Sequence, residues 1–202
     1  MIRLLKQLPR HVNVACSGGI DSMVALDFLR KGKRDVTVMH FDHGTSHSVD
    51  ARKFIESYCD SHDLKLMIGE CTVQKSPRTS DEMFWRDQRH KFFCQAGSPV
   101  ITAHHLDDVT EWWILSALRG MPSVIPIENE DNNVCRPFLV TPKESIQYWA
   151  QANQVPHICD PSNESRAHMR NIVRHDIMQH ALKVNPGLRK MVRKKVIQSI
   201  EK

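Results

Sequence analysis

Short apolar runs alternate with amphipathic stretches along the chain. The runs are rich in apolar and β-branched residues and stop at polar or glycine-bearing turns, which is typical of strands. The stretches between them place apolar side chains three and four positions apart, which is typical of helices. Strands are expected at 12–16, 36–41, 64–68, 100–104 and 134–138. Helices are expected at 21–31, 48–62, 80–95, 107–118, 142–153, 165–182 and 187–200.

This strand–helix rhythm predicts the fold class. Strands that alternate with helices form a parallel sheet covered on both faces. We therefore expect an α/β, Rossmann-like sheet of about five parallel strands with a helical C-terminal end. The length of 202 residues suits a single domain, taken as 1–202. In such sheets a ligand lies outside the carboxyl ends of the strands, so polar residues directly after the strands are the first candidates for chemistry.

Composition excludes two classes of protein. No run of 18 apolar residues exists, so we expect no membrane-spanning helix. With 41% hydrophobic and 25% charged residues, the chain is not of disordered composition. The first residues carry frequent charges and no small-residue cleavage site, so we expect no signal peptide and a cytoplasmic protein. The six cysteines show no CxxC spacing and are expected to be reduced thiols.

Positive charge gathers at the C-terminal end. Residues 166–202 hold ten basic and two acidic side chains, a balance of +8 in a chain of net charge +5. Residues 1–165 therefore carry −3. A basic end on a mildly acidic body indicates a polyanionic partner such as nucleic acid, and the alternative is a solvated helix face. The helix at about 186–202 carries most of this charge.

The loop after the first expected strand is suited to an anion. Gly18 and Gly19 allow a tight turn and a close approach of a ligand. The helix that follows offers unbonded N–H groups and a positive dipole end, and the hydroxyls of Ser17 and Ser22 add donors. This predicts a phosphate or pyrophosphate site, although the spacing is neither GxxxxGK[ST] nor GxGxxG. The alternative is an ordinary turn in which Ser17 or Asp21 caps the helix.

Adjacent carboxylates follow the fourth expected strand. Asp107 and Asp108 begin a helix, and Glu111 shares their face. Neighbouring carboxylates are unfavourable without a cation, which predicts Mg²⁺ held together with phosphate oxygens, and a substrate ammonium beside Glu111. The alternatives are that both aspartates only stabilise the helix dipole, or that a zinc site includes His104 and His105.

SGGIDS at 17–22 resembles the SGGxDS signature of the PP-loop, or N-type ATP pyrophosphatase, superfamily. Further segments resemble tRNA(Ile)-lysidine synthases, and they occur in that family's order. These are HFDHG at 40–44, SDEMFWRDQRHKFF at 80–93, TAHHLDDVTE at 102–111, LRG at 118–120, RPFL at 136–139, and DPSN at 160–163 with RNIVRH at 170–175. The resemblance covers about residues 12–187, nearly the whole chain.

The resemblance implies an adenine nucleotide alpha hydrolase-like fold and an enzyme that splits ATP between the α- and β-phosphates. It implies that the C2 carbonyl of the wobble cytidine in a CAU anticodon becomes an adenylate. The ε-amine of free lysine then displaces AMP. ATP with Mg²⁺ as cofactors, and tRNA and lysine as partners, are thereby expected. Many members continue into C-terminal domains that hold tRNA, and because this sequence stops at Lys202 we expect the catalytic part only.

The resemblance also assigns site residues. ATP and pyrophosphate binding falls to Ser17, Gly18, Gly19, Ile20, Asp21, Ser22, Asp42, His43 and His105, and catalysis to Asp21, Asp107, Asp108 and Glu111. Candidate Mg²⁺ ligands are Asp107 and Asp108, and contacts to substrate or phosphate are Arg86, Arg89, Arg119, Arg170, Asn171 and Arg174. For Arg170 and Arg174 the alternative is pairing with acids such as Asp160 or Glu164.

Three questions stay open at this point. Trp112 and Trp113, where the family has smaller residues, either pack in the core or stack a base. A tRNA thiolation enzyme of the same superfamily is a competing function, against which the lack of CxxC speaks. A nucleotide-binding module without catalysis is another, against which the intact SGGIDS and the Asp107–Asp108 pair speak.

Overall fold

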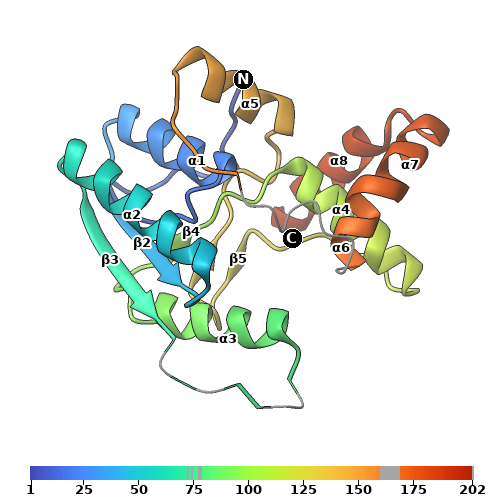
Figure 1. Ribbon diagram of the computed structural model, residues 1–202. Coiled ribbons are helices and arrows are strands. Elements are labelled where there is room, and N and C mark those ends of the chain that lie inside the picture. Colours follow the sequence, from blue (N-terminus) through green and yellow to red (C-terminus); the bar gives the residue numbers. More distant parts are fainter. Residues whose placement is uncertain (72, 74, 77–78, 160–168, 202) are drawn as a thin grey trace.

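The computed structural model describes residues 1–71, 73, 75–76, 79–159 and 169–201 (Figure 1). Its centre is a six-stranded sheet in the order β3-β2-β1-β4-β6-β5. The parallel strands are β1 (His11–Ala15), β2 (Asp35–Asp42), β3 (Lys65–Glu70), β4 (Val100–Ile101) and β6 (Val134–Cys135). β5 (Glu128–Asn129) pairs antiparallel with β6. The α/β class with a mostly parallel sheet is confirmed.

The helices lie where the apolar spacing places them. They are α1 (Ile20–Lys31), α2 (Ser46–Ser61), α3 (Asp81–Phe93), α4 (Leu106–Leu118), α5 (Lys143–Ala152) and α8 (Leu188–Ile200). The described part of the helix expected at 165–182 is α6 (Met169–Ile172), a π-helical segment η2 (Val173–Ile177) and α7 (Met178–Val184). Positions 165–168 of that prediction lie outside the described residues. A π-helical segment inside a helix is frequent at functional sites.

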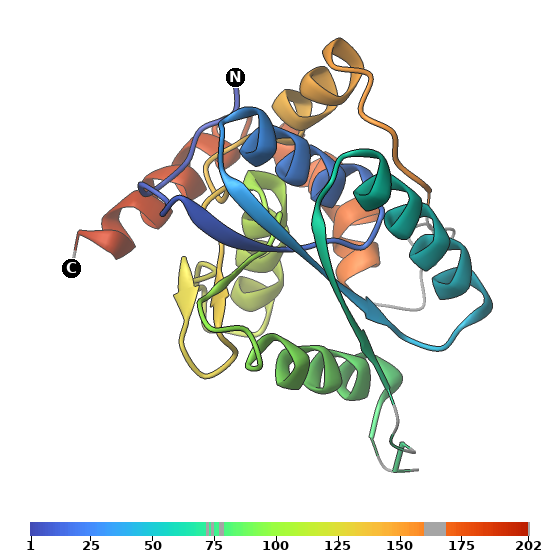
Figure 2. The same cartoon turned by 90° about the vertical axis from the view of Figure 1, so that its left-hand side faces the viewer.

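Alternation along the strands explains why both faces of the sheet carry helices. Val36 and Val38 of β2 join a buried cluster with residues of α1 and α2. Met39 and Phe41 of the same strand join a second cluster with residues of α3. Successive strand side chains face opposite sides, so an unbroken apolar run suits a strand covered on both faces. Figures 1 and 2 show α1 and α2 on one side of the sheet and α3 on the other.

A helical end is attached through α4. Val109 and Ile114 of α4 pack with Val192 and Val196 of α8 in a third buried cluster. Figure 1 shows α4, α6, α7 and α8 gathered at one end of the molecule. The basic C-terminal helix is therefore anchored in the fold. In the part of the chain that the structure describes, no helix is long and apolar enough to cross a membrane.

Three strand predictions need correction. The strands expected at 100–104 and 134–138 end at Ile101 and Cys135. One more bond, from Thr102 N–H to Cys135 O at 2.9 Å, continues the pairing before the chain turns toward α4. The sequence does not predict β5, because a two-residue edge strand is too short for alternation to appear. The sheet therefore has six strands rather than about five.

Candidate active site

The hydroxyl of Ser22 holds the loop between β1 and α1 through two hydrogen bonds. Ser22 Oγ accepts a hydrogen bond from Ser17 N–H at 3.2 Å and donates one to Gly19 O at 2.9 Å. Gly18 has a φ of +83°, which favours glycine. α1 begins at Ile20, and the N–H groups of its first turn have no carbonyl of their own helix to bond. Those groups and the helix dipole suit an anion in front of the loop.

Replacing Gly18 by alanine should damage this loop. A Cβ at Gly18 would stand 3.0 Å from Ile158 Cδ1 and 3.4 Å from Phe54 Cδ1, in a conformation that already disfavours a side chain. We expect Gly18→Ala to lower the free energy of unfolding by about 1–2 kcal/mol and to weaken ATP binding. Urea denaturation and nucleotide titration measure both. Gly97→Ala is the control, because a Cβ there meets nothing within 4 Å. Equal effects in the two variants would contradict the role given to Gly18.

Asp21, in the first turn of α1, lies between two cationic side chains. Lys143 forms an ion pair with Asp21, and His105 Nε2 lies 3.6 Å from Asp21 Oδ1. Burial by itself would raise the pKa of Asp21. The hydrogen bond to His105 and the charges of His105 and Lys143 outweigh burial and lower this pKa to about 2. Asp21 is therefore an anion at physiological pH.

The lowered pKa of Asp21 makes part of the stability depend on pH. An aspartate whose pKa falls from 3.8 to about 2 on folding stabilises the fold above about pH 4, and this contribution is lost as the pH falls toward 2. The loss of stability caused by Asp21→Asn should therefore shrink over that interval, by about 1 kcal/mol because partial exposure screens the charges. Urea unfolding at a series of pH values checks this. Asp60→Asn, on the exposed face of α2, is the control. A pH-independent effect of Asp21→Asn would oppose the assignment.

His105 connects Asp21 to Asp108. It is 3% exposed, and its Nε2 lies 3.5 Å from Asp108 Oδ2. The backbone N–H of His105 also donates to Asp108 Oδ2, at 2.8 Å. Burial would lower the pKa of His105, but the carboxylates of Asp108 and Asp21 raise it above its usual value. The two carboxylates therefore favour the protonated form of His105.

Asp108 and Glu111 form ion pairs with two arginines. Arg170 donates to Asp108 Oδ1 at 2.7 Å and to Glu111 Oε2 at 3.2 Å. Arg174 donates to Glu111 Oε1 at 2.7 Å and to Asp108 Oδ1 at 3.3 Å. Asp108 is 7% and Glu111 3% exposed, so two buried carboxylates of α4 bind partly exposed arginines of α6 and η2. The alternative, that Arg170 and Arg174 pair with acids, is thus observed, and the acids are Asp108 and Glu111. The acids named as examples for that alternative, at positions 160 and 164, lie outside the described residues.

Asp107 has a different environment from its neighbour. Its Oδ1 accepts a hydrogen bond from Arg189 Nε at 2.7 Å, and its Oδ2 accepts one from Lys143 N–H at 3.0 Å. Asp107 thereby ties α4 to α8 and to the start of α5. Among the described residues, no group of three or more His, Cys, Asp or Glu side chains is placed to hold a metal ion. Asp107 and Asp108 each have an arginine partner here, and their role as Mg²⁺ ligands stays a prediction.

Asp42 ends β2 and His43 directly follows it, beside the loop after β1. Asp42 Oδ1 accepts hydrogen bonds from Gly44 N–H at 2.8 Å and from Ser48 Oγ at 2.6 Å, which fixes the turn into α2. The ring of His43 lies 5.1 Å from that of Phe41 and 5.3 Å from that of Trp85, measured between centroids. Their contact with a nucleotide stays a prediction.

The other predicted contact residues lie on the helices around the site. Arg86 and Arg89 belong to α3, Arg119 directly follows α4, and Asn171 belongs to α6. Their contact with substrate also stays a prediction.

The two tryptophans of α4 differ in environment. Trp113 packs, partly buried, against the cluster shared by α4 and α8. Trp112 is 37% exposed, and its Nε1 donates to Ser123 Oγ at 3.1 Å. Trp113 thus contributes to the core, whereas Trp112 is the more exposed of the two and offers a surface on which a base can stack.

The sequence pattern did not single out Lys143 or Arg189. Lys143 occupies the first turn of α5, where a cation opposes the helix dipole. That unfavourable position is a signal that the side chain has a partner elsewhere. Arg189 gives no comparable signal, because α8 contains several basic residues and only the fold brings this one to Asp107.

Comparisons with known proteins agree with the geometry. The model of the PP-loop domain family matches residues 3–181. The chain is 31% identical over 202 residues to the tRNA(Ile)-lysidine synthase of Haemophilus ducreyi, covering 94% of this chain and 47% of that protein. It is 32% identical to the synthase of Thermotoga maritima and 35% identical to that of Neisseria meningitidis serogroup B, covering 87% and 82% of this chain and 46% and 42% of those proteins. The chain spans about half the length of these curated relatives.

Solved structures share the fold. The U34-tRNA thiolase NcsA from Methanococcus maripaludis, with its [4Fe-4S] cluster, superposes with a TM-score of 0.76 at 16% identity, covering 96% of this chain and 74% of that one. The NH3-dependent NAD synthetase from Campylobacter jejuni gives a TM-score of 0.52 at 14% identity, covering 96% and 86%. At such identities the likeness concerns the fold alone. It confirms the Rossmann-like class expected from the sequence.

Proposed function

Because the chain belongs to the PP-loop domain family, we propose that it is an ATP pyrophosphatase that activates a base of tRNA. The observation that supports this most is the run of contacts from the loop at 17–22 through Asp21 and His105 to Asp108. It lies at the carboxyl ends of β1 and β4, on either side of the point where the strand order reverses. Ligands of open α/β sheets bind at such a point.

In this proposal the loop at 17–22 holds the phosphates of ATP. The N–H groups of the first turn of α1 and the hydroxyl of Ser17 donate to phosphate oxygens. The carbonyl oxygen of the base attacks the α-phosphorus, the bond to the β-phosphate breaks, and pyrophosphate leaves. Lys143 and His105 supply positive charge next to this loop, and Asp21 holds both in place.

We propose further that the base is the wobble cytidine of a CAU anticodon and that the nucleophile is the ε-amine of lysine. The similarity to tRNA(Ile)-lysidine synthases over most of the chain supports this choice. The buried pair Asp108 and Glu111 suits an ammonium group, which would replace one of the arginine contacts. The amine loses a proton, its nitrogen bonds to C2, and the bond from C2 to the oxygen of AMP breaks.

The role of Asp107 and Asp108 as Mg²⁺ ligands stays a prediction, and no step of this proposal is routed through the ion. Nor do the two cysteines near the loop favour sulfur transfer. Burial raises the pKa of Cys16 and raises that of Cys59 to about 12, and the thiolate is the reactive form.

Incubation with ATP, labelled lysine and a CAU-anticodon tRNA tests the proposal. After digestion, mass spectrometry should find the label in a modified cytidine. A tRNA with uridine in place of the wobble cytidine is the control and should stay unlabelled. Release of AMP with no lysine in either RNA would contradict the lysine assignment while leaving the ATP chemistry standing.

The exposed face of α8 supports an RNA partner. Lys190 and Lys194 are exposed and Arg193 is partly so. Among the described residues, the ion pairs of α8 are those of Arg189. Replacing Lys190, Arg193 and Lys194 together by alanine should weaken tRNA binding about tenfold or more. It should also reduce the slope of log affinity against log salt by roughly 2–3. The slope falls because a complex with fewer phosphate contacts releases fewer counterions when it forms. Fluorescence anisotropy over a range of KCl concentrations measures both.

A matched control uses exposed lysines far from α8. Lys53 of α2 and Lys65 of β3 are both exposed, and their replacement by alanine should leave the slope unchanged. Substitution is preferable to truncation, because Leu188 and Val192 of α8 are buried in the core. An unchanged slope in the triple variant would show that the basic face is only solvated surface.

A further inference from the structure

Three arginines gather near the residues between β4 and α4. Arg86 and Arg89 stand three positions apart on α3 and therefore share a face of that helix. Arg136 directly follows β6, and the pairing of Ile101 with Cys135 places it next to the segment that leads to His104. Side chains of α3, β4 and β6 share one buried cluster, so α3 packs over these two strands.

Among the described residues, Arg136 is a buried cation without a carboxylate partner. It is 7% exposed, and its Nη1 donates to Pro126 O at 3.0 Å. Its Nε has no hydrogen-bond partner in that part of the chain. Within the described ranges, no ion pair joins Arg136, Arg86 or Arg89 to an acid, whereas Arg170 and Arg174 have two carboxylates each. Burying a charge without a counterion is costly, so such a group is normally matched by an anion.

The charges of the three arginines act on one another and on two histidines. Burial and the charge of Arg86 lower the pKa of Arg89 and that of Arg136. Burial, together with the charges of Arg89, Arg86 and Arg136, lowers the pKa of His90 to about 4. Burial also lowers the pKa of His104 to about 3, and Arg136 and Arg89 contribute to this. The charges of the arginines therefore act on both histidines, which are neutral at physiological pH. On His104 the carboxylate of Asp108 and the charge of Arg170 act as well.

We propose that Arg86, Arg89 and Arg136 form a binding site for a phosphate of the RNA backbone. A guanidinium binds phosphate through two parallel hydrogen bonds, and Arg136 has a buried Nε without a partner among the described residues. The inference rests on the proposed function, which supplies RNA as the polyanion. His104 directly precedes His105, the residue that contacts Asp108, so a phosphate held here brings the neighbouring nucleotide close to Asp108. Arg136 is thus a positioning residue.

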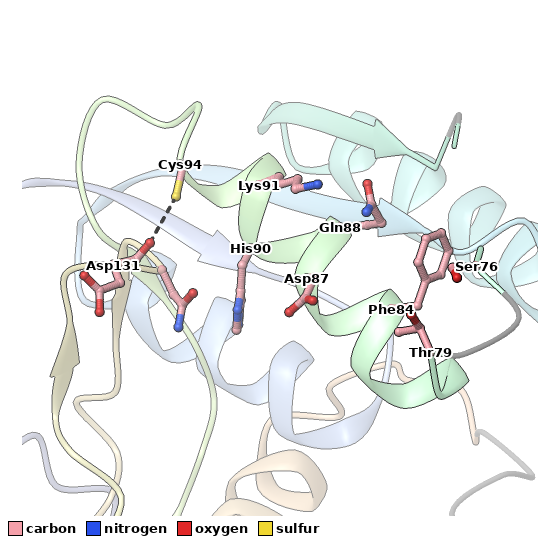
Figure 3. A pocket seen from close by; sticks show the side chains of 10 residues that line it. Ser76, Thr79, Phe84, Asp87, Gln88, His90, Lys91, Cys94 and Asp131 are labelled. Atoms are coloured by element: carbon pink, nitrogen blue, oxygen red, sulfur yellow. Dashed lines mark hydrogen bonds between the residues drawn. The ribbon is translucent and has the colours of Figure 1, made fainter. Parts of the chain in front are cut away.

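An open cavity of about 600 Å³ adjoins this site along α3 (Figure 3). Figure 3 shows His90 and Asp87 extending from one side of the helix, and Gln88 and Lys91 from the other. His90 borders both the cavity and the arginines, so the cavity leaves room for nucleotides next to the bound phosphate. Asp87 is the acid of this lining nearest to His90, and among the described residues it forms no ion pair with the arginines.

The test uses anticodon stem-loop RNAs that each carry one uncharged methylphosphonate linkage. Their binding to the wild type and to Arg136→Gln is measured by fluorescence anisotropy over a range of salt, without ATP or lysine. We expect Arg136→Gln to weaken binding of the unmodified RNA about fivefold or more and to lower the salt slope by roughly 0.7, the value for one phosphate of a single strand. At one position in the RNA, the methylphosphonate linkage should weaken binding to the wild type. At that position it should cause no further loss of affinity in Arg136→Gln.

Arg136→Lys keeps the charge and should lose only part of the affinity, because lysine cannot form the paired hydrogen bonds. Arg10→Gln, at an exposed position, is the control and should bind like the wild type. Thermal unfolding verifies that each variant is folded, and Arg89→Gln takes the place of an Arg136→Gln that does not fold. Equal losses in wild type and variant at every linkage position would overturn the proposal. Unchanged binding of the unmodified RNA by folded Arg136→Gln would do the same. Because no ligation is measured, failure of the lysine chemistry leaves this result unaffected.

Discussion

AMP formation by Asp21→Asn should fall at least about a hundredfold, because the variant keeps the shape of the side chain and loses its charge. In the wild type, this carboxylate holds Lys143 and the ring of His105 beside the loop at 17–22. Without it both cations lose their anchor, and the phosphates of ATP lose the positive charge that stabilises the departing pyrophosphate. Conversion of ATP to AMP, measured with a saturating RNA substrate, gives the rate.

Asp27→Asn is the matched control for this variant. Asp27 lies on the same helix, is 3% exposed and forms ion pairs with Arg30 and Lys31, but it has no contact with the loop. Its replacement should cost stability and leave the rate per folded molecule close to that of the wild type. An Asp21→Asn enzyme that forms AMP at the rate of the control would show that Asp21 has no part in the reaction.

The second large effect is expected for Asp108→Asn. Asp108 is buried and accepts hydrogen bonds from Arg170, Arg174 and the backbone of His105. Removing its charge leaves the two arginines with Glu111 alone, and breaking a buried ion pair costs about 3 kcal/mol. We therefore expect a clear loss of unfolding free energy. We also expect ligation of lysine to fall about a hundredfold or more, because the amine loses half of its carboxylate pair.

A second variant separates the effect of Asp108→Asn on stability from its effect on the ligation rate. Glu144→Gln removes an acid whose ion pair with Arg189 is solvent-exposed, so it should change neither stability nor rate appreciably. Comparing the rates per folded molecule then isolates the chemical role of Asp108. A normal lysine dependence in folded Asp108→Asn would contradict the assignment of the amine to this carboxylate.

Local sequence pattern predicts the strands, helices and turns that depend on residues close together in the sequence. The apolar runs of β1 and β2 and the spacing in α1 to α5 follow from alternation and helical periodicity. The turn at Gly18 follows from glycine. The strand–helix order alone therefore places the loop after β1 and the acids of α4 at the same edge of the sheet.

Local sequence pattern does not predict which charged side chains form ion pairs with one another. Arg170 and Glu111 are 59 residues apart, and Arg189 and Asp107 are 82 apart, so no spacing rule connects them. The adjacent acids Asp107 and Asp108 look like one pair in sequence. Successive helical residues point about 100° apart, which sends them to different arginines.

The buried Arg136 illustrates the same limit. In the sequence it is one basic residue after a short apolar run, matched to a family motif. Its burial and its position relative to α3 arise from the packing of β6 against β4, which only the folded chain displays.

The fate of ATP labelled at the α-phosphate tests the central claim most directly. The protein is incubated with this ATP, an anticodon stem-loop RNA containing the CAU sequence, and lysine, and the products are separated by thin-layer chromatography. We predict labelled AMP, formed in the presence of the RNA and lost in Asp21→Asn. Formation of ADP and inorganic phosphate, or an equal yield of AMP from wild type and Asp21→Asn, would contradict the proposed chemistry.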